Sequence, residues 1–349
     1  MCVFSVFCRK WQYAVDALGD PDPFEADTVL DAHDVKVAFS GVLGVCVRMA
    51  LLKAIQWLKE TPAEEVIAQR EEITTKIIKA AELMNKSGVW DNWFRSSPQH
   101  VKDLCQDDVA GPLLEQLARV TNFRDADAVS LFRTGAGMLN ELEASGLGEP
   151  VESNARPAVA LKENCQKSND ELASGLRQDT NAEKLMEITL ADVVLGRMTA
   201  PVPYNSAEMA HVHLSPRFSV EQEKVDGTKK VRPIDHFSWS GGHGGRASKH
   251  RRKEESVNGY TFPKEKLKTQ TLDYLWAAMA IFVQTLGELP CLFKADINAA
   301  FRRVPICNQD RWACGVAFRW LDQIFVSMHH SCPFGAIGSV HAWERCVLP

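Results

Sequence analysis

The segment over residues 292–306, LFKADINAAFRRVPI, constrains the fold more than any other stretch of this sequence. Its apolar first residues predict a strand over residues 289–295. One isolated carboxylate, Asp296, follows this strand, and an Ala-rich turn separates it from Phe301, five residues later. The pattern favours a buried strand that presents a single carboxylate at its C-terminal tip. Because Asp is also a favoured helix N-cap, that simpler role for Asp296 stays open when the segment is taken alone.

A second motif, KVRPIDHFS at residues 230–238, follows an Asp-Gly pair that predicts a hairpin turn between two strands. Lys230 and Arg232 alternate along the second strand, so both side chains lie on one face and can reach the same phosphate group. Arginine suits this role because its planar guanidinium donates two hydrogen bonds to one phosphate. The alternative is an ordinary basic edge strand that is exposed to solvent.

The third motif, CPFGAIGSVHAW at residues 332–343, follows two further predicted strands, over residues 311–319 and 322–328, and precedes a predicted helix. Gly335 has no side chain and would let the backbone approach a base pair closely, with Phe334 beside it. An ordinary strand-to-helix turn is the alternative for this motif.

Taken in order, the three motifs resemble those of reverse transcriptases of retroelement type, with the texture of DIRS-like and related protist elements. The resemblance runs from about Leu190 to Pro349 and includes LGRMTAP at residues 195–201, which is similar to the short motif before the fingers. KVRPIDHFS is similar to the fingers motif that binds the phosphates of a deoxynucleoside triphosphate (dNTP), a role that carries over to its lysine and arginine. The family usually has a second Asp where His236 stands, so the hydrogen bonding of that turn is expected to differ.

LFKADINAAFRRVPI is similar to palm motif A, which makes Asp296 the metal-ligand candidate and the backbone carbonyl of Ile297 a second metal contact. Phe301 falls at the aromatic steric gate, whose ring would crowd a ribose 2′-hydroxyl, so the implied product is DNA. CPFGAIGSVHAW is similar to motif B, with Phe334 and Gly335 near the template base. The resemblance therefore implies a pair of Mg²⁺ ions, a dNTP substrate, an RNA template and a DNA primer.

Palm motif C, a hairpin that bears Asp-Asp in this family, does not follow motif B within the 349 residues. We therefore expect a fragment of an RNA-directed DNA polymerase, without motif C or thumb, that is inactive on its own. Two alternatives stay open: a non-catalytic nucleic-acid-binding remnant of a retroelement, and a protein-interaction remnant of one.

The predicted fold class is α+β, with a helical region over residues 1–145, a linker or long loop over residues 146–180, and partial fingers and palm of a right-hand polymerase over residues 181–349. No role and no protein partner is assigned to the helical region. Helical spacing and stop signals predict helices over residues 66–84, 110–120, 126–143, 182–196 and 269–286.

Two glycines in RTGAGML, Gly135 and Gly137, are spaced as in a nucleotide-binding loop. No strand is predicted before them, and Asn140 stands where such a loop has its third glycine. We therefore interpret this segment as a turn or a helix irregularity.

The two parts of the chain differ in charge. Residues 1–200 contain 21 Lys and Arg against 31 Asp and Glu, whereas residues 201–349 contain 19 against 14. A glycine-rich loop holds the densest basic cluster, made of Arg246, Lys249, Arg251, Arg252 and Lys253. These charges favour contact between the C-terminal part and a nucleic-acid backbone. Ordinary scatter of charge and a solvated loop are the alternatives.

The ten cysteines include no CxxC pair and no regular spacing, which predicts reduced thiols in a nuclear or cytosolic protein. The apolar start, MCVFSVFCRKW, is short and carries Arg9 and Lys10 in place of a small-residue cleavage site, so no secretion signal is expected. Arg48 and Lys53 interrupt the apolar stretch over residues 38–58, which predicts a buried helix face and no membrane partner.

Overall fold

The computed structural model describes residues 45–347 with several gaps. The residues left out within this range are 108, 122, 124, 147, 153–154, 156, 224–226, 241–255, 267–271, 288, 291–296 and 298. The chain forms two compact units: a sheet unit of residues 81–267 and 298–349, and a helical unit of residues 2–80 and 268–297. This division differs from the predicted boundaries at residues 145 and 181.

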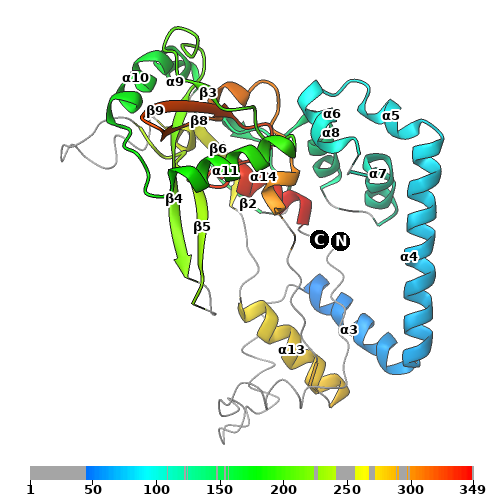
Figure 1. Ribbon diagram of the computed structural model, residues 1–349. Helices are drawn as coiled ribbons and strands as arrows, with labels where there is room; N and C mark the ends of the chain where they lie inside the picture. Colours follow the sequence, from blue (N-terminus) through cyan, green and yellow to red (C-terminus); the bar gives the residue numbers. More distant parts are fainter. Residues whose placement is uncertain are drawn as a thin grey trace, which may run out of the picture. The chain divides into compact units, whose positions relative to one another are not determined.

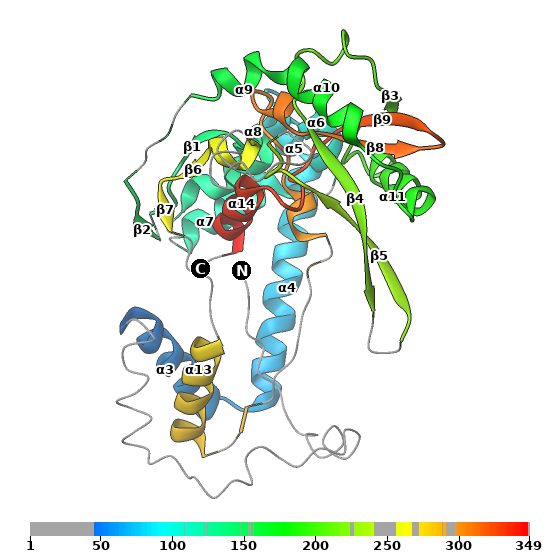
Figure 2. The ribbon, with the colours of Figure 1, turned by 90° about the vertical axis from the view of Figure 1, so that its left-hand side faces the viewer.

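The helical unit contains α3 (Val45–Glu60), α13 (Leu272–Leu286) and the first part of α4 (Ala63–Lys86), with α3 lying beside α13 (Figure 2). Ile55 and Val66 are buried in it. The predicted helices over residues 66–84 and 269–286 are confirmed where the structure describes them. No helix in the described part of the chain combines the length and the apolar character that a membrane span requires.

The sheet unit is built around a five-stranded sheet in the order β3-β9-β8-β4-β5. Its strands are β3 (Val202–Pro203), β4 (Leu214–Glu223), β5 (Lys229–Asp235), β8 (Gly315–Trp320) and β9 (Gln323–Met328). β4 runs parallel to β8, and the other neighbours are antiparallel. The far ends of β4 and β5 extend beyond the other strands as a two-stranded hairpin (Figure 1). The hairpin predicted from the Asp-Gly pair is therefore confirmed.

Helices cover both faces of the sheet, because β8 and β9 lie between α10 (Cys165–Gly175) and α11 (Ala182–Val194) (Figures 1 and 2). Leu172 of α10 packs with Ala317, whereas Leu185 of α11 packs with the next strand residue, Phe318. Successive residues of a strand point to opposite faces, so the two helices bury opposite sides of β8. The predicted helix over residues 182–196 is confirmed over most of its length.

The linker or long loop predicted over residues 146–180 is wrong for its second half, which forms α9 (Val159–Glu163) and α10. Most side chains of this stretch are polar, and that composition suggested a loop. Leu161, Cys165 and Leu172 are nevertheless almost completely buried against the rest of the sheet unit. Three inward-facing apolar residues are enough to dock two short helices whose other faces are solvated.

The N-terminal part of the sheet unit contains α5 (Val89–Phe94), α6 (Gln99–Cys105) and α7 (Gly111–Val120). The predicted helix over residues 110–120 is confirmed by α7. Trp90 and Phe94 are buried together with Cys105, and Trp93 packs against this cluster from outside. Aromatic packing of this kind fixes the short helices to one another.

The helix predicted over residues 126–143 is wrong after its first turns. The structure has η1 (Ala126–Ser130), α8 (Leu131–Thr134) and then β1 (Asn140–Leu142), which pairs in parallel with β6 (Thr261–Pro263). Gly135 ends the helix with φ +85°, and a Cβ there would lie 2.4 Å from the carbonyl carbon of Ile306. The glycine is therefore needed for a close backbone approach that only the tertiary fold imposes.

The remaining short elements complete the sheet unit: β2 (Glu149–Pro150), which pairs with β7 (Glu265–Lys266), η2 (Val257–Tyr260), η3 (Ala300–Arg303), η4 (Arg311–Ala313) and α14 (Ile337–Val347). The predicted strand over residues 322–328 is confirmed by β9, whereas that over residues 311–319 begins later, because its first residues form η4. The predicted strand over residues 289–295 lies largely outside the described residues. Helices and several sheets are thus combined in the described residues, as the α+β prediction requires.

Candidate nucleotide-binding site

The second and third sequence motifs meet at Gly335. Its φ is +94°, and a Cβ built on it would lie 2.4 Å from the carbonyl oxygen of Asp235, the last residue of β5. Any other residue would therefore force the two segments apart. Gly335 was predicted to allow a close approach to a base pair, and in the structure it allows the close approach of another backbone segment.

Asn258 joins the second and third motifs by hydrogen bonds and was not identified from the sequence. Its side-chain nitrogen donates hydrogen bonds to the carbonyl oxygen of Gly335 (2.8 Å) and to the hydroxyl of Ser238 (2.9 Å). Its side-chain oxygen accepts a hydrogen bond from the backbone N–H of Ile337 (2.9 Å). Asn258 follows the basic loop in sequence and belongs to no recognisable motif, so only the fold reveals its partners.

Phe301 and Phe334 lie together, although one comes from the first motif and the other from the third. Their ring centroids are 5.2 Å apart in an edge-to-face arrangement, and the ring of Trp343 lies 6.2 Å from that of Phe301, also edge-to-face. Phe301 is partly buried in η3, whereas Phe334 is largely exposed. The predicted steric-gate residue and the predicted template-contact residue therefore form one aromatic surface.

Lys230 and Arg232 are exposed on β5. In the register of the hairpin, Val220 lies opposite Arg232 and Phe218 lies opposite Ile234, so these residues share one face of the hairpin. Phe218 and Val220 are also partly exposed. Two cations with exposed apolar side chains beside them form a surface that suits a nucleotide, whose phosphates and base need different contacts.

Lys229 belongs to the other face of the same strand. Its ammonium group forms an ion pair with Glu221 at 2.8 Å, and both side chains are largely exposed. Lys229 and Lys230 are thus neighbours in sequence but point to opposite faces. The two lysines offer a matched pair for separating a site-specific effect from an effect of net charge.

A buried ionic cluster that sequence analysis did not identify lies at the base of this hairpin, at the end away from its turn. The Nη1 atom of Arg217 on β4 donates to both carboxylate oxygens of Asp235, at 2.8 and 3.1 Å. The Nε2 atom of His329, just after β9, lies 3.1 Å from Asp235. Arg302 of η3 contacts His329 Nδ1 at 2.6 Å and Asp192 of α11 at 3.0 Å. The cluster connects elements that are more than 100 residues apart in sequence.

The hydrogen bonds of the cluster determine the tautomer of His329. A guanidinium group has donors and no acceptor, so Nδ1 of His329 accepts from Arg302 and Nε2 carries the proton that faces Asp235. Burial lowers the pKa of His329 to about 4, which keeps the imidazole neutral. Burial alone would raise the pKa of Asp235, but Arg217, His329 and Arg302 together hold it well below its usual range. Asp235 is therefore ionised and engaged by its protein partners.

The turn after β5 contains His236 and is hydrogen-bonded through its backbone. The N–H of His236 donates to the carbonyl oxygen of Pro216 (3.0 Å), and the N–H of Trp239 donates to the carbonyl oxygen of His236 (2.9 Å). The imidazole of His236 lies edge-to-face with Phe218 at a centroid distance of 6.5 Å. The side chain of His236 thus makes an aromatic contact at this turn.

Several predicted site residues lie outside the described residues: Asp296, Arg246, Lys249, Arg251, Arg252 and Lys253. Ile297 is described and its side chain is partly exposed. The described part of the chain contains no group of three or more His, Cys, Asp or Glu residues that could hold a metal ion. Because Asp235 is committed to arginine, the metal prediction depends on Asp296.

No protein-family model matches this sequence, and no curated protein matches it.

Proposed function

We propose that this chain forms the fingers and part of the palm of an RNA-directed DNA polymerase and binds a dNTP together with a primer–template. The observation that carries the proposal is the meeting of three motifs that are far apart in sequence. Asp235 of the second motif contacts Gly335 of the third, and Phe334 of the third contacts Phe301 of the first. A nucleotide that contacts all three motifs requires this proximity.

In this proposal, Lys230 and Arg232 bind the triphosphate from the exposed face of the hairpin, and the Arg217–Asp235 ion pair holds the base of that hairpin in place. Phe301 excludes a ribose 2′-hydroxyl, while Phe334 and Gly335 lie at the template base. Asp296 and the backbone carbonyl of Ile297 would hold Mg²⁺, which supplies charge neutralisation for the triphosphate and activates the primer hydroxyl.

A second candidate is binding of nucleic acid without catalysis. Residues 217–268 contain 13 Lys and Arg against 7 Asp and Glu, and Lys230 and Arg232 are exposed within that range. Asp296 is the one side-chain ligand that the resemblance assigns to metal in this sequence, so we expect no primer extension by the 349-residue chain. Binding through phosphate contacts alone weakens steeply as salt rises and does not depend on the sugar.

The test compares deoxyribonucleotide and ribonucleotide binding by the 349-residue chain in complex with a labelled primer–template and Mg²⁺. We expect tighter binding of the dNTP, and we expect Phe301→Ala to reduce that preference by about tenfold or more, since a steric clash is removed. Trp57→Ala, at an exposed aromatic residue of α3, serves as the control and should leave the preference unchanged.

Salt-sensitive binding of the primer–template with equal affinity for both sugars would favour the second candidate. Absence of nucleotide binding under all conditions would refute the polymerase proposal. Measurable primer extension would instead show that the chain completes a metal site without further carboxylates.

A further inference from the structure

The helix α4 carries an apolar seam with the spacing of a coiled coil. Its 24 residues, AEEVIAQREEITTKIIKAAELMNK, place the seam at positions that are alternately four and three residues apart: Val66, Arg70, Ile73, Ile77, Ala80 and Met84. This spacing keeps one stripe of side chains on one side of a helix over three heptads. Such a stripe is buried when a second helix packs along it.

Val66 is buried within its own chain, but the rest of the seam is exposed or only partly buried in the described structure. Ile73 is 53% exposed, and Ile77, Ala80 and Met84 are only partly buried. Large apolar side chains that flank the seam are exposed as well, with Ile67 at 46% and Leu83 at 68%. A surface helix of a monomer rarely exposes so many branched apolar residues along three consecutive heptads.

The position of Arg70 in the seam favours an antiparallel over a parallel arrangement of two α4 helices. A parallel second copy would place Arg70 opposite its own equivalent inside the seam, where two like charges repel. An antiparallel second copy centred on Thr75 places Arg70 opposite Ala80 and Ile73 opposite Ile77. The seam is symmetric about Thr75, so its residues from Arg70 to Ala80 meet one another across the two copies, whereas Val66 is already buried within its own chain.

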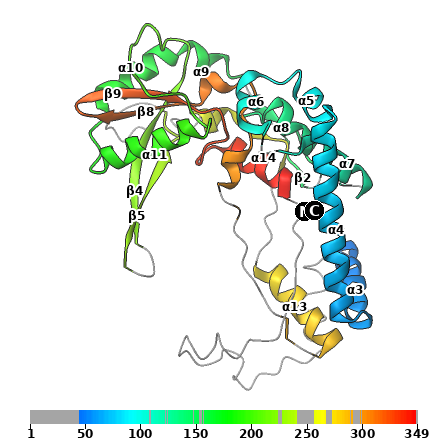
Figure 3. The same ribbon diagram turned by 45° about the vertical axis from the view of Figure 1, so that its right-hand side comes forward.

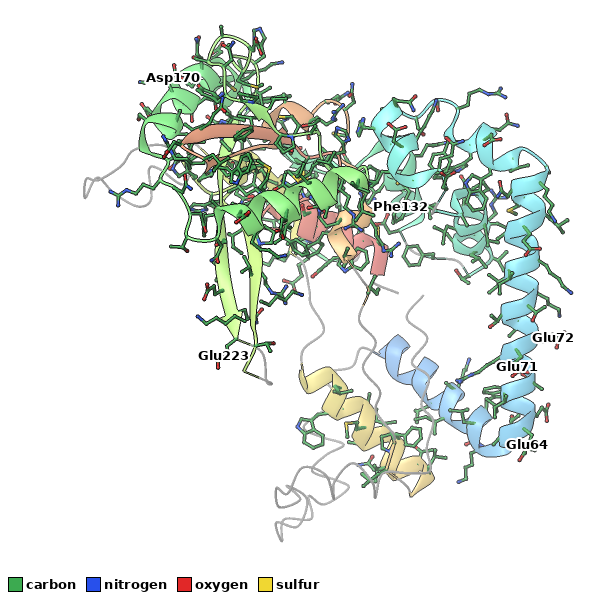
Figure 4. All side chains as sticks on the ribbon, viewed as in Figure 1. Glu64, Glu71, Glu72, Phe132, Asp170 and Glu223 are labelled. Carbon is green, nitrogen blue, oxygen red and sulfur yellow. The ribbon has the colours of Figure 1, made fainter. Side chains whose placement is uncertain are left out.

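The distribution of charge along α4 also favours the antiparallel arrangement. The first half of the helix carries Glu64, Glu65, Glu71 and Glu72 against Arg70 alone, and three of these glutamates are labelled in Figure 4. The second half carries three lysines, Lys76, Lys79 and Lys86, against Glu82. Antiparallel copies therefore bring an acidic half against a basic half, whereas parallel copies bring like halves together.

We propose that α4, drawn as one long helix in Figure 3, is a self-association surface on which a second copy of this chain packs as an antiparallel coiled coil. The contact consists of Ile73 against Ile77, repeated by symmetry, and of Arg70 against Ala80 on either side. This inference does not depend on the proposed polymerase function, since α4 contributes no residue to the candidate nucleotide-binding site.

The first test is the mass of the full chain by light scattering over a range of protein concentrations. We expect a concentration-dependent rise from 38.9 kDa to twice that value. Ile73→Glu should abolish the rise, because it buries a carboxylate in the seam. Thr75→Glu adds the same charge at an exposed position on the outer side of α4 and should leave the rise unchanged. Circular dichroism checks that both variants keep their helix content.

The second test distinguishes the antiparallel direction by cross-linking. Chains with Ile73→Cys are mixed with chains with Ile77→Cys, and disulfides are mapped by mass spectrometry. We expect the mixed 73–77 link to exceed the links between identical positions. A mass of one chain at every concentration, a dimer that survives Ile73→Glu, or preferential 73–73 links would each overturn the proposal.

Discussion

Replacing Asp235 with Asn would disrupt the buried ionic cluster at the base of the hairpin, and its effect can be worked out from the structure. The side chains of Arg217 and Asp235 are 1% and 6% exposed, so neither group can exchange its partner for bulk water. Asparagine keeps the shape of the side chain but removes the negative charge that neutralises Arg217. The guanidinium would then remain buried next to a neutral amide.

Removal of one partner from a buried ion pair costs about 3–5 kcal/mol. We place this substitution at the lower end, about 3 kcal/mol, because the carboxylate of Asp192 lies 4.0 Å from Arg217 and offsets part of the lost charge interaction. A loss of this size is a large fraction of the roughly 5–15 kcal/mol that stabilises most folded domains.

The assay is urea unfolding of the 349-residue chain at pH 7, followed by tryptophan fluorescence. The control is Glu221→Gln, which breaks the exposed Lys229–Glu221 pair on the same hairpin and should leave the unfolding midpoint unchanged. A loss of less than about 1 kcal/mol for Asp235→Asn would refute the conclusion that Asp235 is the required counter-ion of Arg217.

Three further predictions concern the same unit. Gly335→Ala should lower the free energy of unfolding by at least about 2 kcal/mol, because it adds a clash with the Asp235 carbonyl to the strain of a positive φ. Gly227 has φ +76° and open space around it, so Gly227→Ala should lower the free energy of unfolding by about 1 kcal/mol in the same urea assay. Equal losses for the two variants would contradict this explanation. Asn258→Ala should speed hydrogen exchange at the amide of Ile337, whose acceptor it removes, and unchanged protection there would argue against the junction described above. Burial lowers the pKa of His213 and of His329 to about 4, so as the pH falls below 6.5 these residues take up protons in the unfolded chain before they do so in the folded chain. The free energy of unfolding should therefore fall between pH 6.5 and about 4, and a urea midpoint that stays constant at pH 7, 5.5 and 4.5 would contradict this.

The elements predicted correctly from sequence are those whose signals are local. The β4–β5 hairpin follows from alternating side chains on either side of an Asp-Gly turn, and most of α4 follows from its helical spacing. The helix predicted past Thr134 failed for a long-range reason. Gly135 ends this helix where the chain approaches residues 306–307, and no residue near Gly135 in the sequence predicts that contact.

Some residues of the candidate site could be suggested from the sequence, and others could be found only in the structure. Lys230, Arg232, Phe301 and Gly335 could be proposed from the order and spacing of three motifs in the sequence, and their roles stay predictions. The cluster of Asp192, Arg217, Arg302 and His329 around Asp235 could not, because each residue is isolated in sequence and gains its meaning from partners on other elements. Buried ion pairs of this kind depend on the three-dimensional arrangement alone.

The proximity of Lys230 and Arg232 on one hairpin face leads to the most direct test of the proposed function. The measurement is the dissociation constant of a dNTP with Mg²⁺ for the 349-residue chain bound to a primer–template, compared between Arg232→Ala and Lys229→Ala. Each variant removes one positive charge from β5, but from opposite faces. We predict that Arg232→Ala weakens dNTP binding by about tenfold or more, as expected for the loss of a charge-assisted contact of about 1.5–3 kcal/mol, while Lys229→Ala changes it little. Equal affinities of the two variants, or no dNTP binding by the unsubstituted chain, would contradict the proposal that this face holds the triphosphate.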